Sequence, residues 1–199
     1  LALLASGAVR AATPGVDATI DALHDRFVET RRHFHAHPEL SNRETETGAE
    51  IARRLEAMGY EVKRDVAGHG VVATLKGGKP GKLVAYRADI DALPVTEDNA
   101  LPFKSVNPGV MHACGHDLHI AVGLGLAEVL MKHRAQVPGS VRFIFQPAEE
   151  GPSQGDSGAK GMVAAGVLAD PKVDAIAALH VAPNLEAGYI RYGTEAVMA

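Results

Sequence analysis

Two segments near the start of the chain carry apolar residues at helical spacing. In the first, which begins at Asp17, the residues that share one helix face are Ile20, Leu23, Phe27 and Phe34. Pro38 ends this pattern, because proline cannot continue a helix. The pattern therefore predicts an amphipathic helix that ends before Pro38.

A second helix is predicted directly afterwards. Ser41 and Glu44 have the spacing of a capping box, in which the two side chains bond backbone N–H groups at the start of a helix. Apolar residues follow at helical spacing: Ile51, Leu55 and Met58. Gly59 then supplies the residue type that commonly follows a helix end.

Short runs of apolar and β-branched residues predict five strands. They are Tyr60 to Val66, Val71 to Lys76, Lys82 to Arg87, Ser140 to Phe145 and Val173 to Leu179. The Gly-Gly-Lys-Pro-Gly turn at 77–81 is predicted to reverse the chain between the second and the third. The last two runs are apolar throughout, which is typical of strands buried on both faces.

An apolar helix is predicted from Leu118 to Met131, where Gly123 and Gly125 are small enough to let it lie close to a sheet. Strands that alternate with helices indicate an α/β fold with a mixed, largely parallel sheet. The tail from Gly188 begins another strand without a closing element. We therefore expect the chain to stop inside its domain.

Composition and charge narrow the class of protein. The 199 residues are 46% hydrophobic and 22% charged, which suits the core of one globular domain or slightly more. The net charge of −4 and the absence of a basic run leave no electrostatic footprint for nucleic acid, so that class is excluded. No apolar run is long enough to span a membrane.

The first residues, LALLASGAVRAA, are apolar and small. They resemble the end of a signal peptide, with Val9, Arg10 and Ala11 before the cleavage point, although an ordinary N-terminal helical segment is the alternative. We expect residues 1–12 to be a signal-peptide remnant and 13–199 to be the domain. The protein would then be periplasmic or secreted, with a cytoplasmic location as the alternative.

Metal-binding side chains follow three of the predicted strands. In chain order these strands lead into Asp89 and Asp91, into Glu149 and Glu150, and into His180. The carboxyl ends of neighbouring strands in an open α/β sheet face one crevice, so these side chains are expected to converge. The segment MHACGHD, residues 111–117, lies between the first two and directly before the predicted helix.

The chemistry of hydrolysis is compatible with these residue types. Cys114, the only cysteine, and His116 point the same way if the backbone is extended. Thiolate and imidazole bind zinc and other late divalent ions, and carboxylates complete such a shell. Glu149 and Glu150, as neighbours in extended backbone, are expected to face opposite ways. One can then bind metal while the other takes a proton from an activated water.

Each of these residues also has an ordinary structural interpretation. A lone cysteine is most often a small buried residue. The two glutamates fit a solvated loop, and Asp89 and Asp91 fit loop caps. His112 and His119 are expected to pack or to orient other groups rather than to bind metal.

Five ordered motifs carry a resemblance to a known family. They are HFHAHPELSNRE, YRADIDALPV, MHACGHDLHIA, FQPAEEG followed by GAKGM, and ALHVAPNLEAGYI. In this order and spacing they resemble the aminoacylase, hippurate hydrolase and auxin-conjugate amidohydrolase branch of the di-metal zinc-peptidase superfamily. The resemblance covers nearly everything from Asp17 to Ala199. It implies a three-layer domain similar to zinc exopeptidases, with helices flanking a mixed, largely parallel sheet.

The resemblance also implies roles for individual residues. Four of them match metal ligands: Cys114, His116, Glu150 and His180. They would hold two divalent ions, zinc or manganese, with Cys114 bridging them. Glu149 matches the general base. Asp91 belongs to the catalytic site, where it and Asp89 are expected to orient the ligands.

The implied reaction is metal-dependent hydrolysis of the amide bond of N-acyl amino acids, such as hippurate-like or auxin-conjugate-like compounds. A dipeptidase or carboxypeptidase of the same superfamily is one alternative, and a truncated, non-catalytic metal-binding remnant is another. In the family a lid and dimerisation domain interrupts the catalytic domain. That lid is expected to be absent here, and the full-length parent is expected to be a homodimer through it.

Overall fold

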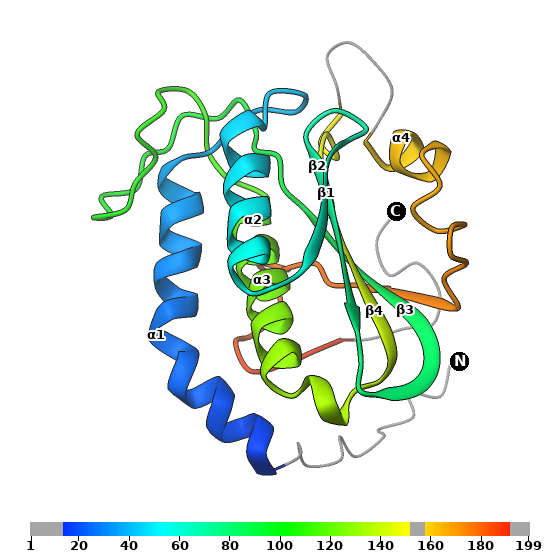
Figure 1. Cartoon of the computed structure of the whole chain (residues 1–199). Helices are drawn as coiled ribbons and strands as arrows, with labels where there is room; N and C mark the ends of the chain where they lie inside the picture. Colours follow the sequence, from blue (N-terminus) through cyan, green and yellow to red (C-terminus); the bar gives the residue numbers. More distant parts are fainter. Residues whose placement is uncertain (1–13, 152–157, 192–199) are drawn as a thin grey trace, which may run out of the picture.

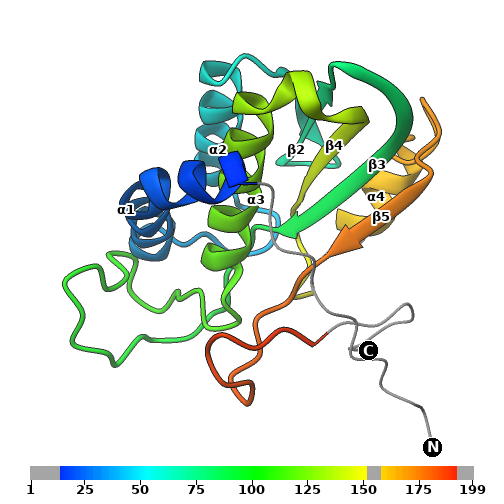
Figure 2. The same cartoon turned by 90° about the horizontal axis from the view of Figure 1, so that it is seen from below.

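A five-stranded mixed sheet has helices on both of its faces (Figures 1 and 2). The computed structural model describes residues 14–151 and 158–191. Its elements are α1 (Pro14–Ala36), α2 (Thr45–Ala57), β1 (Glu61–Val66), β2 (Gly70–Lys76), β3 (Lys79–Asp89), α3 (His116–Lys132), a 3-10 turn (Arg134–Gln136), β4 (Pro138–Gln146), α4 (Gly158–Ala164) and β5 (Ala175–Ala178). The expected signal-peptide remnant, 1–12, lies outside the described residues.

The strands lie side by side in the order β1-β2-β4-β3-β5. β4 is antiparallel to β2 and parallel to β3, and β3 is also parallel to β5. The mixed sheet expected from the sequence is confirmed, with two parallel and two antiparallel pairs. The turn at 77–81 reverses the chain as predicted, but β4 lies between β2 and β3. β4 is therefore central, which explains why nearly all of its residues are buried.

One face of the sheet is covered by α3 and α2, with α1 packed outside α3 (Figures 1 and 2). Large, fully buried side chains of this layer include Phe34, Ile51, Leu55, Phe143 and Phe145. Burying one such side chain contributes about 1.5–3 kcal/mol. None of the helices in the described ranges is long and apolar enough to cross a membrane.

The two glycines of α3 permit close packing against two different partners. A Cβ atom at Gly123 would lie 2.9 Å from the ring of Phe145, so glycine lets α3 approach β4 as predicted. Gly125 instead faces the ring of Phe27 in α1. The prediction that Gly125 lies against the sheet is therefore wrong. Residues two positions apart along a helix face nearly opposite ways, so Gly125 faces α1 instead.

The opposite face of the sheet is covered by α4 and the segment after it (Figure 2). Met162 of α4 packs in a second apolar cluster with Val72 of β2, Ile144 of β4 and Val167. Together the two helical layers and the sheet make the three-layer arrangement that the family resemblance implies.

β5 contradicts the prediction that this strand is buried on both faces. All four of its residues are exposed, and Ile176 is 53% exposed. β5 pairs only with β3 and forms an edge of the sheet in the described part of the chain. The pattern of a short apolar run does not show whether a strand is central or at an edge. The expected further strand is also not seen at 188–191, and 192–199 lie outside the described residues.

α2 does not begin with the predicted capping box. The helix starts at Thr45, and Glu44 occupies the N-cap position without a side-chain cap bond to any described residue. The Ser41 hydroxyl instead donates to Asp91 Oδ2 at 2.6 Å, and Glu44 Oε1 accepts a bond from the backbone N–H of Ala148 at 2.7 Å. Tertiary bonds have replaced the local ones. Both lie at the carboxyl edge of β3 and β4.

Candidate metal centre

The parallel strands bring the predicted site residues to one edge of the sheet. In the strand register Asp89 is paired with Gln146, and Arg87 is paired with Ala178. The segments that follow β3, β4 and β5 therefore leave the sheet at the same edge. The start of α3 lies at this edge too, because His116 contacts groups from all three segments. The predicted convergence is confirmed.

Short distances join the predicted ligands. Cys114 Sγ lies 3.5 Å from His180 Nε2. His116 Nε2 lies 3.6 Å from Glu150 Oε1 and 3.8 Å from Glu149 Oε2. Three groups of side chains offer ligand atoms within 4.8 Å of one another: Cys114 with His116 and His180; His116 with Glu149 and Glu150; and Asp89 with His116 and His119. His116 belongs to all three groups.

Hydrogen bonds at Nδ1 make Nε2 the acceptor nitrogen on each of two histidines. His116 Nδ1 lies 2.9 Å from the backbone oxygen of Asp91 and 3.2 Å from Asp91 Oδ1, so Nδ1–H donates there. His180 Nδ1 lies 2.6 Å from the backbone oxygen of Val181 and donates to it. In both rings Nε2 then carries the lone pair, as a metal-binding imidazole requires. Asp91 and the Val181 carbonyl thereby orient the two rings.

His119 differs from these two histidines because both of its nitrogens are engaged. Its Nδ1 donates to Asp89 Oδ1, and its Nε2 accepts a bond from the backbone N–H of Val181 at 3.1 Å. The ring is fully buried. Although His119 falls within one of the three groups, it has no free lone pair for a metal ion. It holds other groups in place, in agreement with the prediction that it packs or orients.

Two buried polar atoms face each other without a hydrogen-bond partner among the described residues. They are His116 Nε2 and Glu150 Oε1, which are 3.6 Å apart. A buried acceptor without a partner costs free energy. The Nε2 lone pair and the carboxylate oxygen are both acceptors, so neither can donate a hydrogen bond to the other. A divalent cation would satisfy both atoms at once. The donor set of thiol, imidazoles and carboxylates therefore fits a zinc-type or manganese-type ion.

The electrostatics of the site also favour a cation. Burial, with help from the Glu150, Glu149 and Asp89 carboxylates, raises the pKa of Cys114 to about 12. The pKa of His116 is raised as well: burial opposes the shift, but the neighbouring carboxylates outweigh it. The carboxylates contribute to both shifts, and in their field a buried Cys114 thiolate requires a positive partner.

Asp89 stays ionised although it is fully buried. Burial alone would raise its pKa, but the hydrogen bond from His119 and the nearby His116 and Arg87 side chains lower it to about 2. Arg87 Nη1 lies 2.7 Å from Asp89 Oδ2. Asp89 therefore accepts a hydrogen bond from Nδ1–H of His119, and Nε2 of that ring remains an acceptor.

The two glutamates do not face opposite ways, which corrects the prediction. Both carboxylates approach His116 Nε2, and the backbone here is not extended, because the chain bends at Glu150. Asp91 Oδ2 accepts the backbone N–H of Glu150 at 2.9 Å, which fixes the same segment. The Glu149 side chain is 37% exposed and that of Glu150 only 18%. Glu149 is thus the more open of the two to an incoming substrate.

The segment from Cys114 to His116 is not extended either. Cys114 lies in a turn, Gly115 has a left-handed φ of 86°, and His116 is the first residue of α3. The two side chains still converge, through the turn rather than through strand alternation.

Several residues that shape the site were not recognised as such from the sequence. Ser41 and Glu44 looked like a local helix cap, and Arg87 looked like an ordinary strand residue. His112 is 4% exposed and belongs to none of the three groups, which agrees with a packing role. The long-range bonds of Ser41, Glu44 and Arg87 leave no local pattern in the sequence that could have revealed them.

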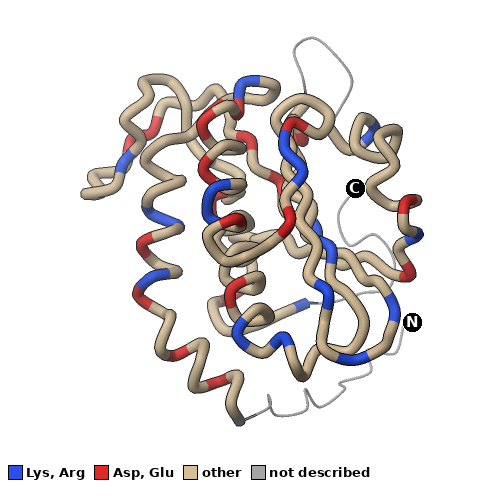
Figure 3. The backbone as a smooth tube through the Cα atoms, in the orientation of Figure 1, with Lys and Arg blue, Asp and Glu red and all other residues tan. Residues whose placement is uncertain are grey.

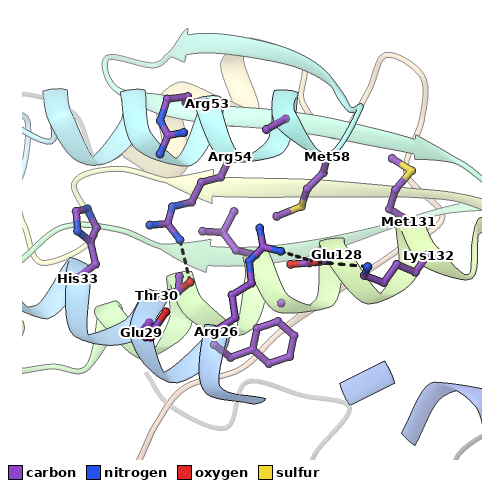
Figure 4. Close-up of a pocket in the computed structure, with 14 residues that line it drawn as sticks. Arg26, Glu29, Thr30, His33, Arg53, Arg54, Met58, Glu128, Met131 and Lys132 are labelled. Carbon is purple, nitrogen blue, oxygen red and sulfur yellow. Dashed lines mark hydrogen bonds and ion pairs between the residues drawn. The ribbon is translucent and has the colours of Figure 1, made fainter. Parts of the chain in front are cut away.

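A cavity of about 590 Å³ lies away from this centre, between α1, α2 and α3 (Figure 4). Arg26 Nη1 donates to Glu128 Oε1 at 2.9 Å, and Arg54 Nη1 donates to Thr30 Oγ1 at 2.8 Å. Basic and acidic residues alternate along these helices (Figure 3). Most charged groups of this wall pair with neighbours: Arg26, Arg53, Arg54, Glu128 and Lys132. The residues of the three metal-binding groups do not line the cavity.

The sequence is similar to known hydrolases. Residues 85–195 match the model of Peptidase family M20/M25/M40. N-acetylcysteine deacetylase from Bacillus subtilis is 47% identical over 171 residues, which cover 85% of this chain and 43% of that protein. Thermostable carboxypeptidase 1 from Saccharolobus solfataricus is 43% identical over 178 residues, which cover 89% of this chain and 44% of that protein.

The fold is similar to that of a solved relative. The structure of the Bacillus subtilis YXEP protein, described as a dinuclear metal binding peptidase from the M20 family, matches with a TM-score of 0.76 at 46% identity. The match covers 83% of this chain and 45% of that one. The chain thus spans less than half the length of the relatives it matches. The family model covers more than half of the chain, which confirms the resemblance in the motifs, and the chain belongs to Peptidase family M20/M25/M40.

Proposed function

We propose that the chain carries the metal-binding centre of an enzyme that hydrolyses the amide bond of N-acyl amino acids. The observation that supports it most directly is the convergence of Cys114, His116 and His180 with two glutamates at one edge of the sheet. Nε2 of His116 lies beside the Glu150 carboxylate, and Nε2 of His180 lies beside Cys114 Sγ. Similarity to N-acetylcysteine deacetylase supports the choice of substrate class.

Two divalent ions, zinc or manganese, would be held by four side chains: Cys114, His116, Glu150 and His180. Cys114 would contribute a thiolate donor. When bound, such ions supply Lewis-acid chemistry that activates water and polarises a carbonyl group. Thiolate and imidazole donors favour zinc, whereas the carboxylates also accept manganese.

Glu149 is proposed as the general base. Its carboxylate is the more exposed of the two and still lies 3.8 Å from His116 Nε2. It accepts a proton from the attacking water, whose oxygen forms a bond with the acyl carbon. When the C–N bond breaks, Glu149 passes that proton to the leaving amine nitrogen. The products are a carboxylic acid and a free amino acid.

Asp91 is proposed to act through its neighbours. Its carboxylate accepts bonds from the Ser41 hydroxyl, the Glu150 backbone N–H and the His116 ring. These bonds hold a carboxylate ligand and an imidazole ligand in fixed relative positions. Orienting groups of this kind typically change metal affinity or activity about 10- to 100-fold.

The proposal is tested by incubating the chain with N-acetylated amino acids and with dipeptides, in the presence of zinc or manganese and in the presence of a chelator. The expected result is release of free amino acid from the acylated compounds only when metal is present. Hydrolysis of dipeptides alone would favour the second candidate, a peptidase, which similarity to a carboxypeptidase supports. Metal binding without any hydrolysis would identify a non-catalytic metal-binding chain, and failure to bind either metal would refute the proposed centre.

A further inference from the structure

We propose that His119 is a positioning residue that sets the place of His180 through the backbone N–H of Val181. The proposal rests on the proposed function only in that His180 is a metal ligand. The bond itself is a property of the metal-free chain.

The strand before His180 provides little support for its position. β5 ends at Ala178, and all four of its residues are exposed. Its register with β3 ends at the pair Arg87 and Ala178, two residues before His180. The His180 side chain bonds its own neighbour through Nδ1 and contacts Cys114 through Nε2. Contacts from outside β5 must therefore fix the backbone that carries the ring.

His119 provides such a contact. Its Nε2 accepts the Val181 N–H at 3.1 Å, and its ring stacks edge-on against His180 with 4.7 Å between centroids. His119 is completely buried in the first turn of α3, so its position is determined by the core. The bond thus connects a poorly supported segment to a rigid helix.

Asp89 determines the direction of this bond. A neutral imidazole has one N–H and one acceptor nitrogen, and the Asp89 carboxylate accepts a hydrogen bond from the Nδ1–H group. Nε2 is then the acceptor that the Val181 N–H requires. Arg87 in turn pairs with Asp89. A chain of contacts therefore runs from β3 through His119 to the residue after His180.

Two variants separate the two bonds of His119. The amide of glutamine reaches the position of Nε2, so His119→Gln can keep the bond to Val181 and lose the one to Asp89. The amide of asparagine reaches the position of Nδ1, so His119→Asn can keep the bond to Asp89 and lose the bond to Val181. His37, an exposed histidine that follows α1, provides the matched control as His37→Gln and His37→Asn.

The first measurement is the affinity of the chain for Co²⁺, with no other metal present. Binding is monitored by the charge-transfer absorption between the Cys114 thiolate and cobalt. Loss of an orienting bond is expected to weaken binding about 10- to 100-fold in His119→Asn. His119→Gln is expected to stay close to the wild type, as are both His37 variants. The opposite order, or equal affinities of the two His119 variants, would overturn the proposal.

The second measurement needs no metal. Amide hydrogen exchange of Val181 in the metal-free chain is expected to be at least about fivefold faster in His119→Asn than in the wild type or His119→Gln. Exchange at buried amides of β4 should be the same in all three. Equal exchange at Val181 in the two variants would contradict the role of His119.

The third measurement uses the unchanged protein, so it does not depend on whether a variant folds. A scalar coupling across the hydrogen bond, between Val181 N and His119 Nε2, is expected in the NMR spectrum of the metal-free chain. Its absence would refute the bond. A wild-type chain that shows the coupling but binds no Co²⁺ would refute the proposed function and leave the bond in place.

Discussion

Glu44 Oε1 accepts a hydrogen bond from the backbone N–H of Ala148 at 2.7 Å and thereby joins two segments that are 104 residues apart. Both groups are buried, and Ala148 directly precedes the two glutamates of the candidate site. Glu44→Ala would leave this N–H without a partner. We expect the free energy of unfolding to fall by about 1–3 kcal/mol, measured by urea denaturation.

Glu46, in the first turn of α2 and exposed, provides the matched control. Glu46→Ala removes a charge near the same helix start, and we expect a loss of no more than about 1 kcal/mol. Equal losses for the two variants would show that the bond between Glu44 and Ala148 contributes nothing beyond charge.

Glu44 also makes stability depend on pH. Burial raises the pKa of this carboxyl above its ordinary value of 4.5. Well below that value the group is protonated in both the folded and the unfolded chain. As the pH rises, the unfolded chain loses the proton first, so stability falls until the pH has passed the folded pKa.

The neutral variant Glu44→Gln removes this dependence and keeps an oxygen that can accept the Ala148 N–H. We therefore expect Glu44→Gln to gain stability relative to the wild type as the pH rises from about 4 to about 8. Urea denaturation at several pH values measures this difference. A constant difference over that range would show that Glu44 has the same pKa in the folded and unfolded chains.

The order of the motifs along the chain made the site predictable from the sequence. Side chains that follow three strands converge because the three strands are parallel, and the sequence contains both the strands and the side chains. The same reasoning could not find the supports of the site. Ser41 and Glu44 satisfy the pattern of a local cap, yet each bonds a segment that is distant in sequence.

The local geometry was predicted less well where the backbone is irregular. The chain bends at Glu150 and both glutamates approach His116, which the residue types alone do not indicate. The exposure of β5 is a second example, because it depends on which strands lie beside it. Both features depend on the tertiary structure, whereas strand and helix periodicity is a local property.

Cys114→Ser tests whether the thiol is a metal ligand. The hydroxyl is similar in size but is a far weaker ligand than a thiolate. Substitutions of orienting residues alone cost about 10- to 100-fold in metal affinity, so loss of the thiolate should cost at least about tenfold. A competition titration of Zn²⁺ against a chromophoric chelator measures this. Unchanged affinity would show that Cys114 is a packing residue and not a ligand.

Glu149 and Glu150 are neighbours with different proposed roles, so each is the control for the other. Glu149→Gln is expected to retain bound metal and lower turnover about 100- to 10,000-fold, because it removes the base. Glu150→Gln is expected to lower the metal affinity itself. Metal content by elemental analysis and hydrolysis at saturating metal measure the two effects. Loss of metal in Glu149→Gln would instead make Glu149 a ligand.

Gly115 permits Val181 to pack against the start of α3. Its φ of 86° favours glycine, and a Cβ atom there would lie 2.3 Å from Val181 Cγ2. Gly115→Ala is therefore expected to strain the backbone and to displace the segment that carries His180. We expect a loss of stability above about 1 kcal/mol together with weaker Zn²⁺ binding.

Gly109 separates backbone strain from the clash with Val181. It has a φ of 77°, and a Cβ atom added there would meet no described atom within 4 Å. Gly109→Ala should lose the stability that backbone strain costs but bind Zn²⁺ normally. Adding Val181→Ala to Gly115→Ala removes the clashing methyl group and should restore part of the Zn²⁺ affinity. If Gly109→Ala weakened Zn²⁺ binding as much as Gly115→Ala, the contact with Val181 would have no part in placing His180.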